Sequence, residues 1–225
     1  MPPEQPARRG PREPGQYARE RGVELASRPA LLGAGLLAIT AVTWVVFGLR
    51  GLPFVLIELI AVCLMLALYR LYSSQADRWL QGAAGEQAVG AICAELEADG
   101  WHAIHDVSLG KGNVDHILVG PGGIFTIETK SHRARVHVNR LEPKMLKQAY
   151  AEKKLIERIT GLDVQPLLVF SEAWLVGSVP ARRGGVVVLP ARMLRHYCSR
   201  RRPVLDANAA TKLHGQLVSA LFANV

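Results

Sequence analysis

The chain has 225 residues, of which 49% are hydrophobic, and its 27 lysines and arginines outnumber its 19 acidic residues to give a net charge of +8. This length leaves room for one domain of ordinary size and an attached segment. The cysteines Cys63, Cys93 and Cys198 are far apart and form no CxxC pair. Their spacing argues against a disulfide framework and a cysteine zinc site, and fits a reducing compartment.

Residues 1–29 contain six arginines and six prolines but few large apolar side chains. Such a composition buries too little apolar surface to offset the entropy of ordering the chain. It predicts a flexible basic tail.

Two apolar segments follow, residues 30–49 and 52–69, separated by Arg50-Gly51. Twenty helical residues extend about 30 Å, the thickness of the hydrocarbon core of a bilayer. We expect a two-helix transmembrane hairpin. A secretory signal peptide and a hairpin buried in a soluble core are the alternatives, but the apolar part of a signal peptide has only about 7–15 residues.

Basic residues flank this hairpin on the outside, with six arginines before it and Arg70 and Arg78 after it. The positive-inside rule therefore predicts an inner or plasma membrane protein with both termini in the cytoplasm. Glu58 lies within the second span. It would either be protonated and bond the neighbouring helix, at the depth of Thr43, or pack between protomers of a homo-oligomer.

After a linker at 70–81, the pattern from Gly82 onward is that of a soluble domain. Apolar residues at helical spacing predict a helix that ends near Gly100; they are Ala88, Val89, Ile92, Cys93 and Leu96. Glu86 lies at the edge of its apolar face, where it would belong to a site or merely complement the helix N-terminus. A strand over 101–109 and a turn at 110–112 come next.

The central segment, residues 113–130, predicts two strands joined by the turn Gly120-Pro121-Gly122-Gly123. Folded antiparallel, it pairs Val119 with Ile124, Ile117 with Thr126 and Asp115 with Glu128. Facing side chains share one face of a sheet. Lys130, two residues beyond Glu128, lies on that face as well.

Two facing carboxylates on an apolar sheet repel each other, and a divalent cation would relieve the repulsion. Mg²⁺ takes one or two carboxylates and keeps water ligands for substrate phosphates. We therefore expect Asp115 and Glu128 to bind Mg²⁺ or Mn²⁺, while Lys130 positions an attacking water or neutralises developing charge. The alternative is a salt-bridged hairpin in which Lys130 only neutralises Glu128.

Three motifs in this order, GEQAV at 85–89, NVDHILVGPGGIFTIETK at 113–130 and KQAY at 147–150, resemble the nuclease-related (NERD) domain of the PD-(D/E)XK nuclease superfamily. The resemblance covers about residues 82–198. It implies metal binding by Asp115 and Glu128, water positioning by Lys130, a further acidic role for Glu86, and a polar role for Gln148. The family often has an aromatic residue and a glycine after Lys130, whereas this chain has Ser131-His132-Arg133-Ala134.

The remaining elements are expected as a strand at 135–140, a helix from Pro143 to Gly161, strands at 165–170 and 185–189, and helices at 191–198 and 206–222. Asp206 is the expected N-cap of the last helix. This order favours an α/β fold with a mixed sheet flanked by helices, which the resemblance identifies as restriction-endonuclease-like. Residues 82–198 would form the domain and 199–225 a C-terminal helical extension.

The helix at 143–161 carries a basic stripe at helical spacing, formed by Lys144, Lys147, Lys154 and Arg158. It would be a solvated face or a contact to nucleic-acid phosphates. The register turns His116 away from Asp115, so we expect a core histidine, and no HExxH or Cys/His spacing indicates zinc.

These features together predict a membrane-anchored, Mg²⁺- or Mn²⁺-dependent nuclease that hydrolyses phosphodiester bonds of DNA or RNA. One alternative is a catalytically silent module that binds nucleic acid or protein at the membrane. Another is a purely structural membrane protein. The complete set of Asp115, Glu128 and Lys130 favours the enzyme.

Overall fold

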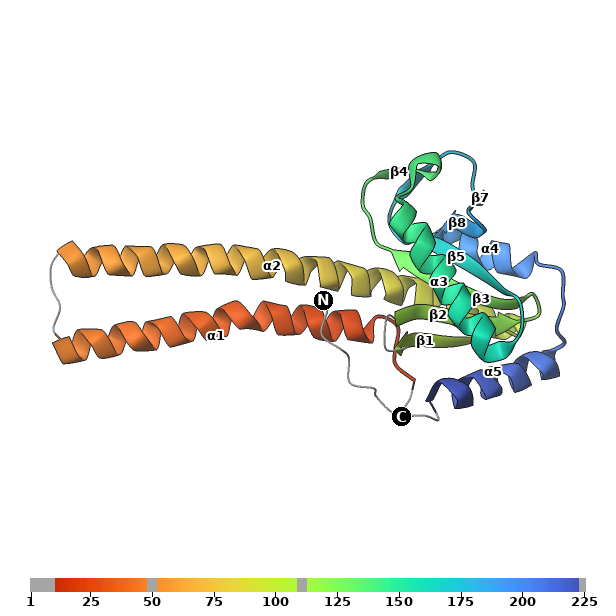
Figure 1. The fold of residues 1–225 in the computed structure, drawn as a ribbon, viewed down its shortest axis with the longest axis horizontal. Coiled ribbons are helices and arrows are strands. Elements are labelled where there is room, and N and C mark those ends of the chain that lie inside the picture. The colour runs from red at the N-terminus through yellow and green to blue at the C-terminus, as the bar shows by residue number, and fades with distance from the viewer. Residues whose placement is uncertain (1–10, 48–51, 109–112, 223–225) are drawn as a thin grey trace. The chain divides into compact units, whose positions relative to one another are not determined.

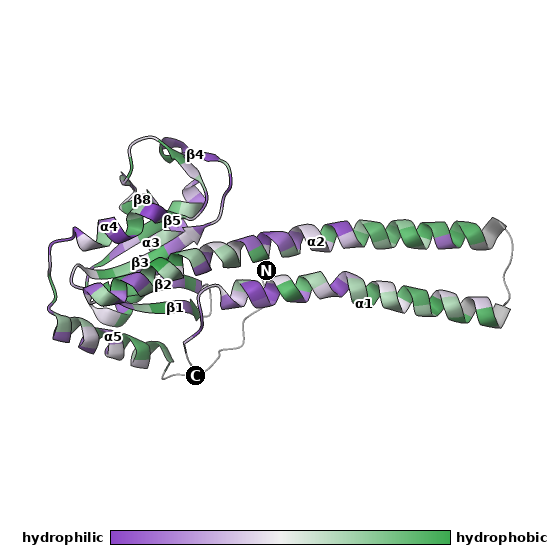
Figure 2. Cartoon of the chain, turned by 180° about the vertical axis from the view of Figure 1, so that it is seen from behind, coloured by the Kyte–Doolittle hydropathy of each residue, from purple (hydrophilic) through white to green (hydrophobic). Residues whose placement is uncertain are grey.

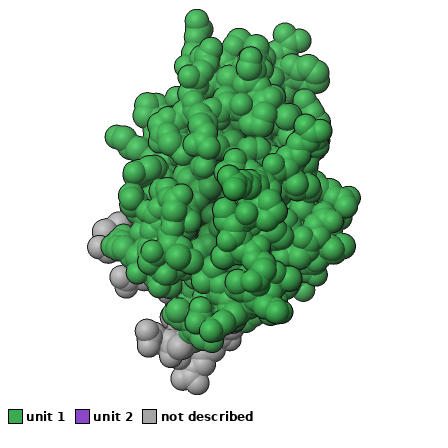
Figure 3. All heavy atoms as spheres, turned by 90° about the vertical axis from the view of Figure 1, so that its right-hand side faces the viewer, with its two compact units in different colours: residues 1–16, 82–225 green, residues 17–81 purple. Residues whose placement is uncertain are grey.

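The structure, a computed structural model, describes residues 11–47, 52–108 and 113–222. It divides into two compact units, which are described separately: unit 1 comprises residues 1–16 and 82–225, and unit 2 comprises residues 17–81. Figure 3 shows the atoms of unit 1 in green. The expected turns at 50–51 and 110–112 lie outside the described residues.

Unit 2 is formed by α1 (Gln16–Phe47) and the first part of α2 (Leu52–Glu95). Both helices are long and apolar enough to cross a membrane, and Figure 2 shows their apolar residues gathered toward the segment that connects them. Large apolar side chains point outward here, with Leu37 69% and Ile60 67% exposed. The Thr40 hydroxyl donates a hydrogen bond to Glu58 at 3.5 Å, so Glu58 bonds the neighbouring helix as expected; the side chain of Thr43 is not described.

Two boundaries differ from the sequence-based expectation. Residues 16–29, expected in a flexible tail, are helical, because Ala18 and Leu25 are spaced two turns apart and are both buried. Tyr17 also packs edge-on against Trp79, with 5.8 Å between ring centroids. Residues 70–81, expected as a linker, are helical as well, since α2 continues without a break.

The core of unit 1 is a six-stranded mixed sheet in the order β1-β2-β3-β5-β8-β7 (Figure 1). Its strands are β1 (His102–Ser108), β2 (Asn113–Gly120), β3 (Gly123–Lys130), β5 (Val164–Phe170), β7 (Ala181–Arg183) and β8 (Val186–Pro190). β1, β2 and β3 are antiparallel neighbours, β3, β5 and β8 run parallel, and β7 is antiparallel to β8. β4 (Arg135–His137) and β6 (Trp174–Val176) form a separate parallel pair.

Helices cover both faces of this sheet. On one face, α3 (Pro143–Thr160) and α5 (Ala207–Phe222) pack against side chains such as Ile117 and Leu168. On the other face, the end of α2 and α4 (Leu194–Ser199) pack against side chains such as Leu118 and Leu167. The 3₁₀ helices are η1 (Leu96–Asp99), η2 (Val138–Arg140) and η3 (Ala191–Met193). The predicted mixed α/β fold is therefore confirmed.

The predicted ends of α3 and α5 are also confirmed. Gly161 follows α3 with a φ of 68°, the left-handed conformation typical of a helix C-terminus. Asp206 caps α5, accepting a hydrogen bond from the Ala209 backbone N–H at 2.7 Å. The strand predicted at 135–140 ends at His137, and the residues that follow form η2, which begins at Val138.

The C-terminal helix α5 packs on the sheet of unit 1. Leu217 is 1% exposed and Leu221 is 9% exposed, and both pack in one cluster with Ile104 and Val107 of β1. Residues 199–225 were expected to form a C-terminal helical extension, and their helix α5 supplies the apolar cover of β1 and β2.

Candidate active site

The β2–β3 hairpin places the central carboxylates at one end of the sheet. Its register pairs Val119 with Ile124 and Ile117 with Thr126, as the sequence predicted. Continued two residues further, this register brings Asp115 opposite Glu128. The carboxylate of Asp115 accepts a hydrogen bond from the Thr129 backbone N–H at 2.7 Å, so this side chain takes over a position that a strand carbonyl would otherwise fill.

Glu128 and Lys130 form an ion pair at the end of β3. Glu128 is only 2% exposed, and the Lys130 ammonium donates to its Oε1. The ammonium also donates to Oε1 of Gln148 on α3 at 3.3 Å. Burial alone would lower the pKa of Lys130, but the charge and hydrogen bond of Glu128 outweigh it and raise that pKa. The second oxygen of Glu128 is buried and has no hydrogen-bond partner among the described residues.

Glu152 is a further carboxyl group at this position that the sequence analysis did not find. It follows Gln148 by one turn of α3 and is 6% exposed. Neither of its oxygens has a hydrogen-bond partner in the described part of the chain. Burial, and then the charge of Glu128, raise its pKa well above the usual value. Glu152 follows Gln148 at i, i+4 spacing, which places both side chains on one side of α3 and could have indicated that Glu152 belongs to the site. The sequence analysis considered only the basic residues of this helix.

Glu86 reaches the same group of charges from α2. Burial, followed by the charges of Asp106 and Glu128, raises its pKa to about 7. Gly85 makes this approach possible, because a Cβ at that position would lie 1.7 Å from the Ser131 hydroxyl. A glycine directly before Glu86 therefore lets the helix lie against the end of β3.

Asp106 is a second acidic residue that the sequence did not reveal. It lies across from Asp115, between the paired residues of β1 and β2, and has a φ of 48°. Such a conformation is costly for a residue other than glycine, and it concentrates at functional sites. Asp106 is 3% exposed, accepts a hydrogen bond from Asn113, and lies 3.6 Å from the Arg12 guanidinium.

Carboxyl groups therefore outnumber cationic groups at this end of the sheet. The carboxyl groups of Glu86, Asp115, Glu128 and Glu152 act on one another, and burial and then Glu128 raise the pKa of Asp115. Over the residues that the structure describes, no three His, Cys, Asp or Glu side chains are grouped so that they could hold a metal ion. The arrangement is a pair of facing carboxylates, with Lys130 bound to one of them.

The basic stripe on α3 is exposed, but its members differ in their partners. Lys154 is paired with Glu157 at 2.9 Å, and Arg158 donates to the backbone oxygen of Lys154. Lys144 and Lys147 are exposed and make no ion pair with the described residues. Lys154 is therefore the member of the stripe whose charge is compensated by a carboxylate of the described residues, whereas Lys144, Lys147 and Arg158 form no such ion pair.

His116 is a core histidine, as predicted. It is 0% exposed, and its Nδ1 lies 2.8 Å from Nδ1 of His105. Burial, followed by the effect of His105, lowers its pKa to about 3, so the ring is neutral at physiological pH. It lies on the opposite face of the sheet from Asp115 and takes no part in the carboxylate site.

Unit 1 is thus a mixed α/β domain with two facing carboxyl groups and a lysine at the end of a β-hairpin. Residues 81–171 match the sequence profile of the nuclease-related domain family. The matched segment contains all the predicted residues of the carboxylate site: Glu86, Asp115, Glu128, Lys130 and Gln148.

Individual relatives add little to this assignment. An uncharacterized protein of Bacillus anthracis is 25% identical over 85 residues, which are 36% of this chain and 40% of that protein. The match thus spans well under half the length of that relative. The structure of Pyrococcus furiosus SfsA in complex with Ca²⁺ covers 63% of this chain and 53% of its own at 16% identity, with a TM-score of 0.27. A likeness at that level supports no inference about this chain.

Proposed function

We propose that the protein is a membrane-anchored nuclease that hydrolyses phosphodiester bonds of DNA or RNA with the help of Mg²⁺ or Mn²⁺. The observation that carries this proposal is the excess of buried carboxyl groups around Lys130, within a segment that matches the nuclease-related domain family. A nuclease-related domain indicates an interaction with nucleic acid, and the chemistry of the site supports cleavage.

The donor atoms suit a hard divalent cation. Asp115 and Glu128 would hold it, since carboxylate oxygens are the ligands that Mg²⁺ prefers and two carboxylates with several waters form a common Mg²⁺ site. The buried oxygen of Glu128 without a partner among the described residues is the donor best suited to this role. The bound cation would supply Lewis acidity toward the scissile phosphate.

The residues of the chain would perform the remaining tasks. The Lys130 ammonium would orient the attacking water or neutralise charge that develops on the phosphate oxygens. Gln148 would hold that ammonium in place through the hydrogen bond that it already accepts. Glu86 and Glu152 would release their protons when the cation binds, and their carboxylates would then help to compensate its charge.

Nucleic acid would reach this site along the exposed side of α3. Lys144 and Lys147 lie on the same helix as Gln148, and their charges are free of ion pairs with the described residues. Contacts of lysine with phosphates give affinity without sequence preference.

The two apolar helices would anchor the protein in an inner or plasma membrane, with both termini and the nuclease-related domain in the cytoplasm. The exposed apolar side chains of unit 2 support this proposal, since a soluble helical hairpin would bury them. A homo-oligomer formed through the hairpin is a further proposal. It receives less support, because Glu58 already bonds Thr40 within one chain.

A catalytically silent binding module is the second candidate. One observation favours it: Lys130 and Glu128 already neutralise each other without a cation. In the nuclease a divalent cation would bind Glu128 in addition to or in place of Lys130, whereas in the silent module the ion pair would stay as it is.

The deciding experiment uses the full-length protein in detergent. Mg²⁺ and Mn²⁺ binding is measured by calorimetry, and cleavage is measured on labelled DNA and RNA. Asp115→Asn should reduce the metal affinity at least tenfold, because it removes one charged ligand at nearly constant shape. Lys130→Met should abolish cleavage while the cation still binds.

Arg133→Met is the matched control, since Arg133 pairs with Glu172 on the surface close to the site. Unchanged metal affinity in Asp115→Asn would show that the cation binds elsewhere. A parent protein that binds the cation and nucleic acid but cleaves neither DNA nor RNA would establish the silent module.

A further inference from the structure

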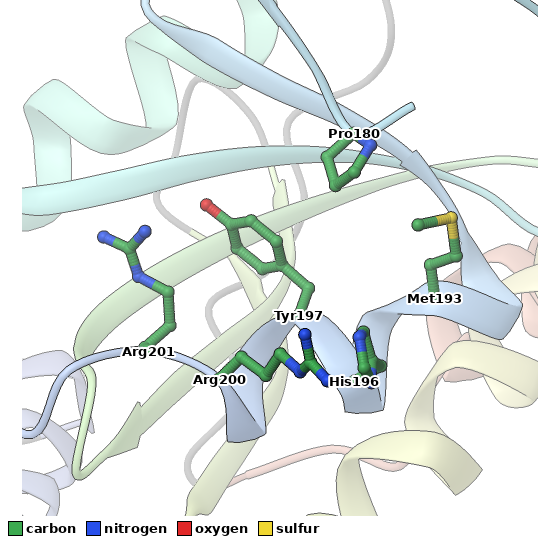
Figure 4. A pocket seen from close by; sticks show the side chains of 6 residues that line it. All are labelled: Pro180, Met193, His196, Tyr197, Arg200 and Arg201. Atoms are coloured by element: carbon green, nitrogen blue, oxygen red, sulfur yellow. The ribbon is translucent and has the colours of Figure 1, made fainter. Parts of the chain in front are cut away.

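A half-open cavity lies beside α4, on the face of the sheet opposite to the one that α3 and α5 cover. It has a volume of about 290 Å³ and is lined by Pro180, Met193, His196, Tyr197, Arg200 and Arg201 (Figure 4). Arg201 packs on Gly122, and the Val204 backbone N–H bonds the Pro121 carbonyl at 2.7 Å. Pro121 and Gly122 form the turn before β3, so the backbone of Arg201 lies near the end of that strand opposite to Lys130, roughly 20–25 Å away.

The lining of the cavity is mostly apolar and includes two arginine side chains. Figure 4 shows the Tyr197 ring between Arg201 on one side and Met193 on the other, with Pro180 beyond the ring. The Arg201 guanidinium lies 5.6 Å from the centroid of this ring. Tyr197 is fixed from behind by Phe125, with 6.2 Å between ring centroids, so it forms a rigid wall.

The charges on this wall lack acidic partners. Arg200 and Arg201 form no ion pair with any residue that the structure describes, whereas Arg195 on the same helix lies 3.5 Å from Glu95 and 3.8 Å from Asp99. The Tyr197 hydroxyl oxygen is buried and has no hydrogen-bond partner in the described part of the chain. The positive charge of Arg182 on β7 opposes the rise that burial causes in the pKa of the Tyr197 hydroxyl.

These features match one ligand chemistry. Guanidinium groups bind phosphate through parallel hydrogen bonds, and a tyrosine hydroxyl adds a donor. Aromatic rings, guanidinium planes and apolar side chains such as methionine accept the flat face of a nucleobase. We infer that this cavity binds a nucleoside monophosphate unit, with its phosphate at Arg201 and the Tyr197 hydroxyl and its base or sugar against Met193 and Pro180.

The unit comes either from a free nucleotide or from a nucleic-acid strand. Binding is measured on the full-length protein in EDTA by calorimetry, with adenosine monophosphate, inorganic phosphate, adenosine and a ten-nucleotide DNA strand as probes. Adenosine monophosphate should bind at least tenfold more tightly than inorganic phosphate or adenosine alone. Displacement of the nucleotide by the DNA strand identifies a strand as the source, and failure to displace it identifies the free nucleotide.

Variants locate the binding site. Arg200→Ala combined with Arg201→Ala should weaken nucleotide binding more than tenfold, and Tyr197→Phe, which removes one hydroxyl group, by about tenfold. Arg195→Ala is the control and should bind as the parent does, because its charge is already compensated. Lys130→Met should also bind normally, which separates this inference from the proposed nuclease activity.

Three results would overturn the inference. Adenosine monophosphate could bind no more tightly than inorganic phosphate. Arg195→Ala could weaken binding as much as the Arg200 and Arg201 changes do. Polyglutamate could displace the nucleotide as well as the DNA strand does, which would show an unspecific anion surface. Thermal unfolding of each variant shows whether a loss of binding is a loss of fold.

Discussion

The ion pair between Lys130 and Glu128 makes the stability of the metal-free domain depend on Lys130. Lys130→Met keeps most of the side-chain stem but leaves Glu128, which is 2% exposed, without its cation. Breaking a buried pair from one side costs about 3–5 kcal/mol, and because the Lys130 side chain is 24% exposed we expect the lower end, about 3 kcal/mol. For a domain of this size the melting temperature in EDTA should fall by roughly 6–12 °C.

A divalent cation should reverse this loss if it binds Glu128. At a concentration one hundred times its Kd, a ligand of the folded state contributes about 2.7 kcal/mol. Thermal unfolding followed by tryptophan fluorescence, with EDTA and with Mg²⁺, measures both effects. Glu128→Gln combined with Lys130→Met should recover most of the lost stability, and Arg133→Met should change it by less than about 1 kcal/mol. Equal melting temperatures of the parent and Lys130→Met in EDTA would refute this reasoning.

Three further predictions follow from the charges and the apolar helices. The raised pKa of Glu86, about 7 against an ordinary 4.5, means that the folded state holds a proton that the unfolded state releases. Stability in EDTA should therefore fall by up to about 3 kcal/mol as the pH rises from 4.5 through 7, and Glu86→Gln should flatten that melting profile. Lys144→Ala combined with Lys147→Ala should reduce the salt dependence of nucleic-acid binding by about two units of slope, and the ion-paired Lys154 should contribute less when changed to Ala; equal slopes in all proteins would restore the solvated-face interpretation. Reporter fusions after residues 25 and 80 should both indicate the cytoplasm, and a reporter signal from outside the cytoplasm at residue 80 would contradict the proposed topology.

The central hairpin could be predicted from sequence because its information is local. The apolar runs on either side of the Gly120–Gly123 turn determine a single antiparallel register of the two strands. A slip by one residue would turn the side chain of Ile117 to the opposite face of the sheet. The same holds for α3, where Pro143 and Gly161 mark the two ends. The positions of β5 and β8 followed from short apolar runs, whereas β6 and β7 were not predicted.

Long-range contacts were not readable in this way. Glu152 resembles any polar helical residue until β3 is packed against α3, and only then is its carboxyl group buried next to Glu128. Asp106 and Arg12 are about ninety residues apart in the chain and meet only in the folded domain. The start of α1 at Gln16 was missed because the prediction used the average composition of residues 1–29. The helix depends instead on the spacing of Ala18 and Leu25, which places both side chains on one buried face.

The position of α5 has a consequence for how the domain forms during synthesis. The hairpin that bears Asp115 and Glu128 is complete at Lys130, yet Leu217 and Leu221, which cover its neighbours Ile104 and Val107, are translated about ninety residues later. At 5–20 residues per second, that apolar face waits roughly 4–18 seconds for its cover. Until then the nascent chain exposes an apolar face of the sheet, and a chain truncated after Cys198 should be prone to aggregate.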